Sequence, residues 1–324
     1  MTIKHSIFKK QFPTASELIY GCMGLGGEWD NSKLTRKDID IAETAIDAAT
    51  SVNINFFDLA DIYRHGKSEM AFGHLLKNNQ IKREEIIIQS KCGIKLSPNG
   101  TNHYDFSEQW IEYSLSGILE RLGTDYLDIL MLHRPDILVD TEALNKTLNR
   151  IHTSGRVKAF AVSNMDVSQL QFLEQTLEAP IIANQIELSL SATGPFAYAI
   201  QANSKNSISN QFYHGMFEYA QLNGVELQSW GSLANGLFSK PVNESDTETV
   251  RATKTLVTEL ANHYKVSKEA ILLNFIRRHP ANMRPVIGSL NPDRIKACND
   301  VYRFELSKEH WYALLCSSIG QEVP

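Results

Sequence analysis

The sequence predicts a single domain, residues 1–324, folded as a (β/α)8 barrel with long loops at the C-terminal face of its strands. Two observations carry this prediction. Eight strand-like runs occur along the chain, and most are short, apolar and rich in β-branched residues, as buried parallel strands are. Amphipathic segments of helical period separate them, with about 30 residues per strand-and-helix unit. Strict alternation of this kind implies a parallel sheet, and eight units favour closure into a barrel over an open doubly wound sheet.

The predicted strands are defined by their apolar runs and by the turn residues that bound them. They comprise residues 16–24, 53–60, 84–91, 126–133, 157–164, 180–188, 224–231 and 284–289. Helices are expected between them at 38–51, 67–78, 106–123, 140–155, 166–177 and 214–224, with a further one at 250–265 after an exposed acidic loop. Gly123, Gly155 and Gly224 lie where helices end, because glycine readily adopts the left-handed conformation found there.

Two segments depart from the regular pattern. The glycine cluster at 21–27 lacks the GxGxxG spacing of a dinucleotide fingerprint and does not open directly into a helix. We interpret it as the loop after the first strand, where glycines allow the backbone to approach a ligand. The polar segment 189–215 is long for a connection in a barrel, and it is interpreted as a lid, a substrate loop or a mobile excursion.

Composition narrows the class of protein. The chain has 43% hydrophobic residues and a formal net charge of −5, which gives no reason to expect nucleic acid or an anionic membrane surface as partner. No apolar run approaches the ~18 residues of a membrane span, and charges interrupt the N-terminus before a signal sequence could form. The four cysteines have neither CxxC pairing nor metal-site spacing. We therefore expect a cytoplasmic protein with free thiols and no bound metal.

Four polar residues make the chemical signal of this sequence. Asp58, Lys91 and His133 each lie where a predicted strand ends, and Tyr63 follows Asp58 by five residues. A barrel of parallel strands gathers such ends on one face, where active sites lie. Each residue taken alone also has a structural interpretation as a satisfied polar group. Their convergence from three strand ends is much harder to explain in this way, because barrel interiors are normally filled by apolar layers.

The four side chains suit acid catalysis on a carbonyl group. A tyrosine hydroxyl has a pKa near 10, and a nearby ammonium such as that of Lys91 lowers this value by stabilising the phenolate. Asp58 would pair with Lys91 and keep it charged and positioned. His133 would orient the substrate carbonyl or share its proton transfer. Tyr63 is thus the expected general acid.

The chain also resembles the aldo-keto reductase superfamily, and bacterial oxidoreductases of it in particular. The resemblance rests on FFDLADIYRHGKSE at 56–69, QSKCG at 89–93, RLGTDYLDILMLHRPD at 121–136 and GRVKAFAVSN at 155–164. It continues through ANQIELS at 183–189, QSWGSLANG at 228–236 and PVIGSLNPDRI at 285–295. These motifs occur in the family's order across nearly the whole chain. The resemblance implies an NADPH-dependent reductase with Tyr63 as acid, Lys91 and Asp58 as its tuning pair and His133 orienting the substrate.

The resemblance also implies the residues that would hold NADPH. Ser163, Asn164 and Gln185 would bind the nicotinamide carboxamide, and Trp230 would lie against the nicotinamide ring. The loop that would hold the pyrophosphate comprises Ser232, Leu233, Asn235 and Gly236. The residues after the last strand that would hold the 2′-phosphate are Ser289, Asn291 and Arg294. Met23 and Gly24 of the glycine-rich first loop would complete the site. For Trp230 core packing is the competing interpretation, and for Arg294 it is a solvated residue at a helix start.

The substrate is expected to be a small carbonyl compound, with Trp29 and His133 lining its pocket. The sequence does not determine which aldehyde or ketone is used, nor the direction of the reaction in the cell. It does not determine the oligomeric state either, and a monomer is compatible with it. Two alternatives stay open. One is a cofactor-binding regulatory protein that resembles the potassium-channel β-subunits of the superfamily, and the other is an aldolase in which Lys91 forms a Schiff base.

Overall fold

The computed structural model describes residues 6–97, 100–196 and 214–323, and it contains the predicted closed barrel of eight parallel strands. Around the barrel the strands follow the order β1-β10-β9-β8-β7-β6-β3-β2. All eight predicted strands are confirmed, although most are shorter than expected. Their bounds are β1 Ile19–Gly21, β2 Phe56–Asp58, β3 Ile87–Cys92, β6 Leu127–Leu132, β7 Val157–Ser163, β8 Ile181–Glu187, β9 Glu226–Trp230 and β10 Arg284–Ile287.

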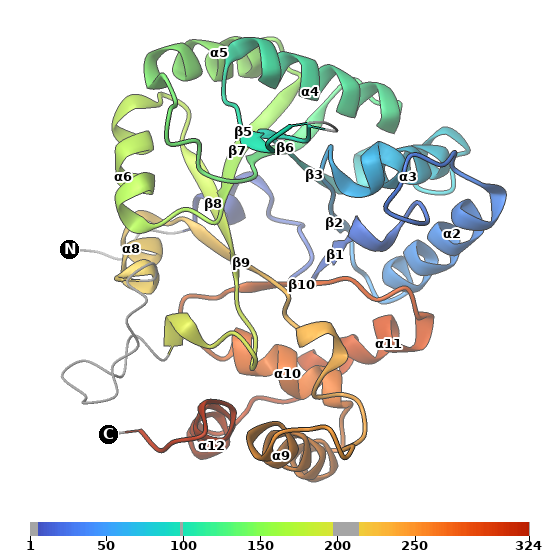
Figure 1. Ribbon diagram of the computed structural model, residues 1–324, viewed down its shortest axis with the longest axis vertical. Coiled ribbons are helices and arrows are strands. Elements are labelled where there is room, and N and C mark those ends of the chain that lie inside the picture. The colour runs from blue at the N-terminus through green and yellow to red at the C-terminus, as the bar shows by residue number, and fades with distance from the viewer. Residues whose placement is uncertain (1–5, 98–99, 197–213, 324) are drawn as a thin grey trace.

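The seven predicted helices are also confirmed, and they surround the strands (Figure 1). They are α2 Arg36–Thr50, α3 Lys67–Lys77, α4 Glu108–Leu122, α5 Thr141–Thr153, α6 Val167–Thr176, α8 Met216–Asn223 and α9 Glu248–Tyr264. Gly123 and Gly224 close α4 and α8 with φ of 66° and 73°, as the sequence predicts. Of the predicted loop at 189–215, residues 197–213 lie outside the described part of the chain.

Several elements were not predicted. They are α1 Ile7–Gln11, α10 Lys268–Arg277, α12 Lys308–Ile319, and a hairpin of β4 Ile94–Lys95 with β5 His103–Tyr104. The helix expected to start near Arg294 is confirmed as α11 Pro292–Ala297. Helix α10 is buried along most of its length. Helices α9 and α12 pack side by side at the lower edge of Figure 1, outside the barrel.

The interior of the barrel is apolar at its N-terminal end. Helix α1 lies across this end, and the ring of Phe8 stacks on Phe56 with centroids 5.5 Å apart. A separate cluster of buried side chains from the strands completes this floor, among them Ile87, Met131 and Ala183. Side chains two residues apart on a strand share a face. The next inward-facing residue of each of these strands therefore lies two positions closer to the C-terminal end, and it is polar.

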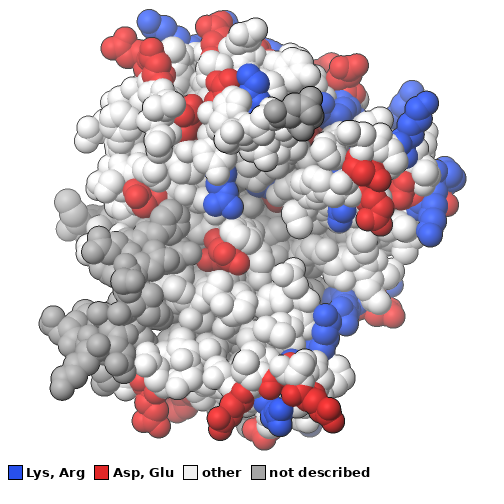
Figure 2. Space-filling model, viewed as in Figure 1, with Lys and Arg blue, Asp and Glu red and all other residues white. Residues whose placement is uncertain are grey.

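Charged side chains lie mainly on the outside of the molecule. On the face drawn in Figure 2, Lys, Arg, Asp and Glu side chains lie mainly over the outer helices, with few over the centre. All four cysteines are free, as predicted, and Cys22, Cys92 and Cys298 are buried. Among the helices in the described ranges, none is both long and apolar enough to cross a membrane.

Candidate active site

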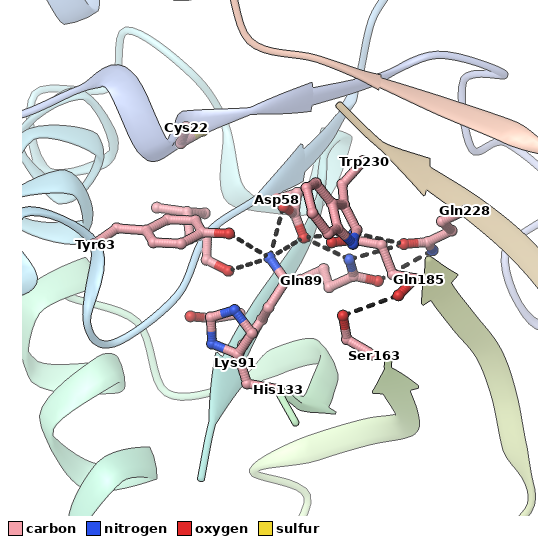
Figure 3. Close-up of polar contacts among 12 residues, drawn as sticks. Cys22, Asp58, Tyr63, Gln89, Lys91, His133, Ser163, Gln185, Gln228 and Trp230 are labelled. Carbon is pink, nitrogen blue, oxygen red and sulfur yellow. Dashed lines mark hydrogen bonds and ion pairs between the residues drawn. The ribbon is translucent and has the colours of Figure 1, made fainter. Parts of the chain in front are cut away.

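The C-terminal ends of β2, β3 and β6 bring the four predicted catalytic residues together (Figure 3). Lys91 Nζ lies 2.7 Å and 2.6 Å from the two carboxylate oxygens of Asp58, and it donates to Tyr63 Oη at 3.1 Å. It also donates to the carbonyl oxygen of Leu59 at 3.0 Å. The imidazole of His133 faces the Tyr63 ring edge-on, with centroids 5.9 Å apart. Residues distant in sequence thus form one cluster because their strands are neighbours in the barrel.

The loop after β2 places Tyr63 over this cluster. The backbone N–H of Asp61 donates to the carbonyl of Lys91 at 3.0 Å, which fixes the loop to the end of β3. The chain then turns sharply, because Arg64 and His65 have positive φ of 51° and 56°. Two successive non-glycine residues rarely adopt this conformation. The turn directs Tyr63 back toward the end of β3 before α3 begins.

Burial and neighbouring charges act in opposite directions on the pKa values of Lys91 and Tyr63. Burial alone would lower the pKa of Lys91, but the negative charge of Asp58 and the hydroxyl of Tyr63 raise it above its usual value. Lys91 is therefore a cation at neutral pH. Burial raises the pKa of Tyr63, and the attraction of Lys91 offsets only part of this effect. The prediction that Lys91 lowers the pKa of Tyr63 is correct for the interaction between these two groups. It is wrong for the overall shift of the Tyr63 pKa, because desolvation of the phenolate is the larger effect.

His133 is held as a neutral imidazole. Burial lowers its pKa well below the usual value, and the positive charges of Lys91 and Arg134 lower it further. Its backbone N–H donates to the carbonyl of Cys92 at 2.9 Å, which continues the pairing of β6 with β3. The buried Nδ1 atom has no hydrogen-bond partner among the described residues. This arrangement is unlike that of a structural histidine, whose ring nitrogens would be satisfied.

Two buried glutamines beside the cluster were missed by the sequence analysis. Gln89 and Gln228 exchange hydrogen bonds across the barrel at 3.0 and 3.1 Å. Asp58 Oδ1 accepts from Gln89 Nε2 at 2.6 Å and from Gln185 Nε2 at 3.2 Å, in addition to Lys91. The carboxylate is thus held by amide donors as well as by its ion-pair partner. The available signal was the position of Gln89 two residues before Lys91, which puts both on the inner face of β3.

The residues predicted to hold a carboxamide meet at the ends of β7 and β8. Asn164 Nδ2 donates to Ser163 Oγ at 2.7 Å and to the carbonyl of His133 at 3.3 Å, and its Oδ1 accepts from Trp230 Nε1 at 3.0 Å. The hydroxyl of Ser163 donates to the carbonyl of Gln185 at 2.9 Å. The indole of Trp230 therefore stands over the amide cluster and fixes the orientation of Asn164. It is not part of the apolar core.

The loop after β9 carries the next predicted group. Ser232 is buried, and its hydroxyl donates to the carbonyl of Ser229 at 2.7 Å, so it holds the loop together. Leu233 packs partly against the core. Asn235 and Gly236 have positive φ of 52° and 74°, which exposes backbone groups in a tight turn.

The segment after β10 lies against that loop. A side chain at Gly236 would meet Arg294 Nη1, 3.7 Å from the ideal Cβ position, so Arg294 reaches the turn after β9. Asn291 caps α11 by accepting from the backbone of Arg294 at 3.1 Å, and Ser289 Oγ accepts from the backbone of Asn291 at 3.1 Å. The guanidinium of the exposed Arg294 forms no ion pair with a described carboxylate. The predicted positions for the two phosphate groups are thus adjacent.

The loop after β1 forms the remaining side of the site. Met23 is 52% exposed and Trp29 is 43% exposed, and the Trp29 ring lies 6.4 Å from that of Tyr63. A Cβ atom at Gly24 would lie 3.3 Å from the Leu290 side chain, so these two loops are in close contact. The structure therefore brings all predicted site residues to one end of the barrel.

Similar proteins identify the family of this chain. The model of the Aldo/keto reductase family matches residues 17–315. The chain belongs to this family. This family member is 30% identical to the 6-dehydroglucose reductase of Agrobacterium fabrum over 95% of its own length and 96% of that protein. It is 28% identical to the oxidoreductase YdhF of Escherichia coli, with 97% of each chain covered.

Solved structures show the same architecture. The glycerol dehydrogenase of Gluconobacter oxydans superposes on this aldo/keto reductase family member with a TM-score of 0.77 at 20% identity, covering 96% of this chain and 94% of that one. An aldo/keto reductase from Klebsiella pneumoniae, solved in complex with NADP and acetate, gives a TM-score of 0.70 at 18% identity, covering 93% and 90%. The resemblance inferred from the sequence motifs and the predicted barrel are thus both confirmed.

Proposed function

We propose that this protein reduces an aldehyde or ketone to an alcohol with NADPH, and that Tyr63 donates the proton to the carbonyl oxygen. The observation that carries the proposal is the hydrogen bond of 3.1 Å between Lys91 and Tyr63. An ammonium has only donors, so the tyrosine oxygen is the acceptor in this bond. The hydroxyl hydrogen of Tyr63 is left free to point toward a substrate.

The pKa shifts agree with this role. A raised pKa keeps Tyr63 protonated at neutral pH, as a proton donor must be. Lys91 lies where it stabilises the phenolate that remains after proton donation, and Asp58 keeps Lys91 charged. His133 is neutral, so one ring nitrogen carries a hydrogen that can be donated to the same carbonyl oxygen. Tyr63 regains its proton from solvent after each turnover.

The amide cluster fits a nicotinamide carboxamide. The described hydrogen bonds of the Gln185 side chain use only its Nε2 atom, which leaves Oε1 to accept from a ligand amide. Trp230 offers an aromatic face beside this cluster, suited to a planar ring. When NADPH is bound, it would supply the hydride that is added to the carbonyl carbon. Two fold relatives from Klebsiella pneumoniae were solved with NADP and with NADPH, which supports this choice of cofactor.

Arg294 is the proposed contact for the 2′-phosphate of NADPH, with Ser289 and Asn291 beside it. A guanidinium and hydroxyl or amide donors near a helix start suit a phosphate group. Arg294→Gln is expected to raise the Kd for NADPH about tenfold and to leave the Kd for NADH unchanged, because only NADPH carries that phosphate. An equal effect on both nucleotides would contradict this assignment.

The proposal is tested by titrating the protein with NADPH and NADH while following tryptophan fluorescence. A panel of aldehydes and ketones, with 6-dehydroglucose among them, is then added and nicotinamide absorbance is recorded. Tyr63→Phe is expected to bind NADPH normally and to lose at least about a hundredfold in turnover, because the acid is removed. Tyr113→Phe, at an exposed position on α4, is the matched control and should keep full activity. Failure of the folded protein to bind either nucleotide would refute the proposal.

The Schiff-base alternative is weaker. A Schiff-base enzyme needs a neutral lysine, whereas Asp58 and Tyr63 keep the pKa of Lys91 above its usual value. Borohydride trapping of a Lys91 adduct with a carbonyl compound would support this alternative. A regulatory protein on the same scaffold would bind NADPH tightly with negligible turnover across the substrate panel.

A further inference from the structure

We propose that the natural substrate carries an oxyanion, a carboxylate or a phosphate, and that the guanidinium of Arg64 binds it. This inference rests on the proposed function and names the chemical class of the substrate. It concerns the rim of the site, which we define as Met23, Trp29, Arg64 and His65.

Arg64 lies at the mouth of the site because it directly follows Tyr63. Its Nε atom donates to the carbonyl of Met23 at 3.2 Å, and its Cζ atom lies 5.4 Å from the centre of the Trp29 ring. Trp29 in turn contacts Tyr63 edge-on with ring centroids 6.4 Å apart. The guanidinium therefore lies between the loops after β1 and β2, next to the residue that would donate the proton.

The charge of Arg64 has no counter-ion in the described part of the chain. The ion pairs that the described residues form near the rim involve other side chains. Asp30 in the neighbouring loop is bound to Lys67 at 2.9 Å, and Asp58 beneath the rim is bound to Lys91. Of the five N–H donors of the guanidinium, only the one on Nε has an acceptor among the described residues. The two terminal nitrogens are thus available to bind two oxygens of a carboxylate or a phosphate with two parallel hydrogen bonds.

The loop after β1 is held so that this arrangement is preformed. Lys67 Nζ, which is almost fully buried, binds Asp30 and also donates to Ser32 Oγ at 3.0 Å. Gly26 has a φ of 87° and lies so close to α3 that a Cβ atom would be 2.6 Å from the carbonyl carbon of Lys67. Trp29 therefore offers a fixed aromatic surface on which Arg64 stacks. A fixed guanidinium loses little conformational freedom when it binds a ligand.

The backbone at the rim also points to a role for these side chains. Arg64 and His65 both have left-handed conformations, with φ of 51° and 56°, where glycine would be free of strain. His65 is exposed, and its ring lies 6.5 Å from that of Trp29, so it adds a second polar group beside the guanidinium. The exposed apolar surfaces of Met23 and Trp29 would contact the carbon skeleton of the same ligand.

The test compares substrates that differ only in charge. We would measure kcat and KM with NADPH for 3- and 4-carboxybenzaldehyde and for their methyl esters, in the wild type, Arg64→Gln and Arg64→Lys. The wild type should prefer the better-placed carboxylate over its ester, and this preference should weaken with added salt. Arg64→Gln should raise the KM for that carboxylate about tenfold and change the KM for the ester less than twofold. Arg64→Lys should retain part of the preference, and Arg303→Gln, an exposed control, should retain all of it.

Three results would overturn the inference. An equal loss with acids and esters would mean that Arg64 only supports the loop of Tyr63. A raised Kd for NADPH in Arg64→Gln, with no change in substrate preference, would assign the guanidinium to the cofactor phosphates. A wild-type preference for the esters would exclude an oxyanion site. If no aldehyde is turned over, the proposed function fails separately, and binding of the same acids and esters to the NADP-saturated protein, followed by tryptophan fluorescence, still decides whether Arg64 selects an anion.

Discussion

Replacing Asp58 by asparagine should destabilise the protein strongly, because it leaves a buried cation without its counter-ion. Lys91 is fully buried, and its Nζ atom contacts both carboxylate oxygens of Asp58. The same carboxylate accepts from Gln89 and Gln185. An asparagine side chain has the same shape as an aspartate side chain, but it carries no charge. Its NH2 group can lie against the N–H donors that now point at the carboxylate.

The magnitude follows from the burial of this pair. Removing one partner of a buried ion pair costs about 3–5 kcal/mol. For a chain of 324 residues the unfolding entropy is about 0.7 kcal/mol per kelvin, so the melting temperature should fall by about 4–7 °C. Once Asp58 is neutral, burial lowers the pKa of Lys91 below that of an unfolded lysine. The unfolded chain then binds more protons, so the stability of Asp58→Asn should rise with pH up to about 10.

The assay is thermal and urea unfolding followed by tryptophan fluorescence and circular dichroism, at pH values from 6 to 9. Glu85→Gln is the matched control, because it breaks a pair with Lys82 in which both side chains are more than 60% exposed. Water and salt screen such an exposed pair, so its loss should change the stability little. The double variant Asp58→Asn with Lys91→Met should recover stability, since the uncompensated charge is gone, but it should remain inactive.

A loss of less than about 1 kcal/mol in Asp58→Asn, with no dependence on pH, would refute this reasoning. It would mean that Lys91 is solvated or that another group compensates its charge. Failure of the double variant to recover stability would instead locate the cost in the amide network around Gln89 and Gln185.

Two further predictions concern neighbouring groups. Trp230→Phe keeps an aromatic ring but removes the donor that orients Asn164, so it should raise the Kd for NADPH about tenfold in a fluorescence titration. Trp311 donates its indole N–H to the carbonyl of Phe275, and the control variant Trp311→Phe should leave this Kd unchanged. Burial and the nearby charge of Glu69 raise the pKa of Asp61 to about 7, so the folded state binds more protons than the unfolded state between about pH 4 and 7, and stability should fall as pH rises through this range. Asp61→Asn should make this fall smaller, and an unchanged dependence of melting temperature on pH would contradict the assignment.

Much of the architecture was open to prediction because the signals are local. The eight strands and seven of the helices follow from apolar runs, helical periods and the glycines that end helices, and those features do not depend on the rest of the chain. Helix α10 was missed, and the burial of its residues 270–276 is decided by packing against neighbouring elements. The hairpin β4–β5 is too short to have a pattern.

The polar layer was only half predictable. Alternation along β3 places Gln89 on the same face as Lys91, so its inward orientation follows from the sequence. Its partnership with Gln228 does not, because those residues are 139 positions apart and lie on opposite sides of the barrel. In the same way, the motif around Tyr63 identifies the acid but not the balance of its pKa. Desolvation depends on everything that surrounds the hydroxyl.

The sequence by itself determined the fold class, the family and the identity of the four residues proposed for catalysis, since each of these depends on residue types at given positions along the chain. The tertiary structure decided which donors surround Asp58, the net direction of the Tyr63 pKa shift and the position of the Arg64 guanidinium at the rim. These properties depend on distances between side chains and on exclusion of water. Such quantities exist only after the barrel has closed and brought distant strand ends together.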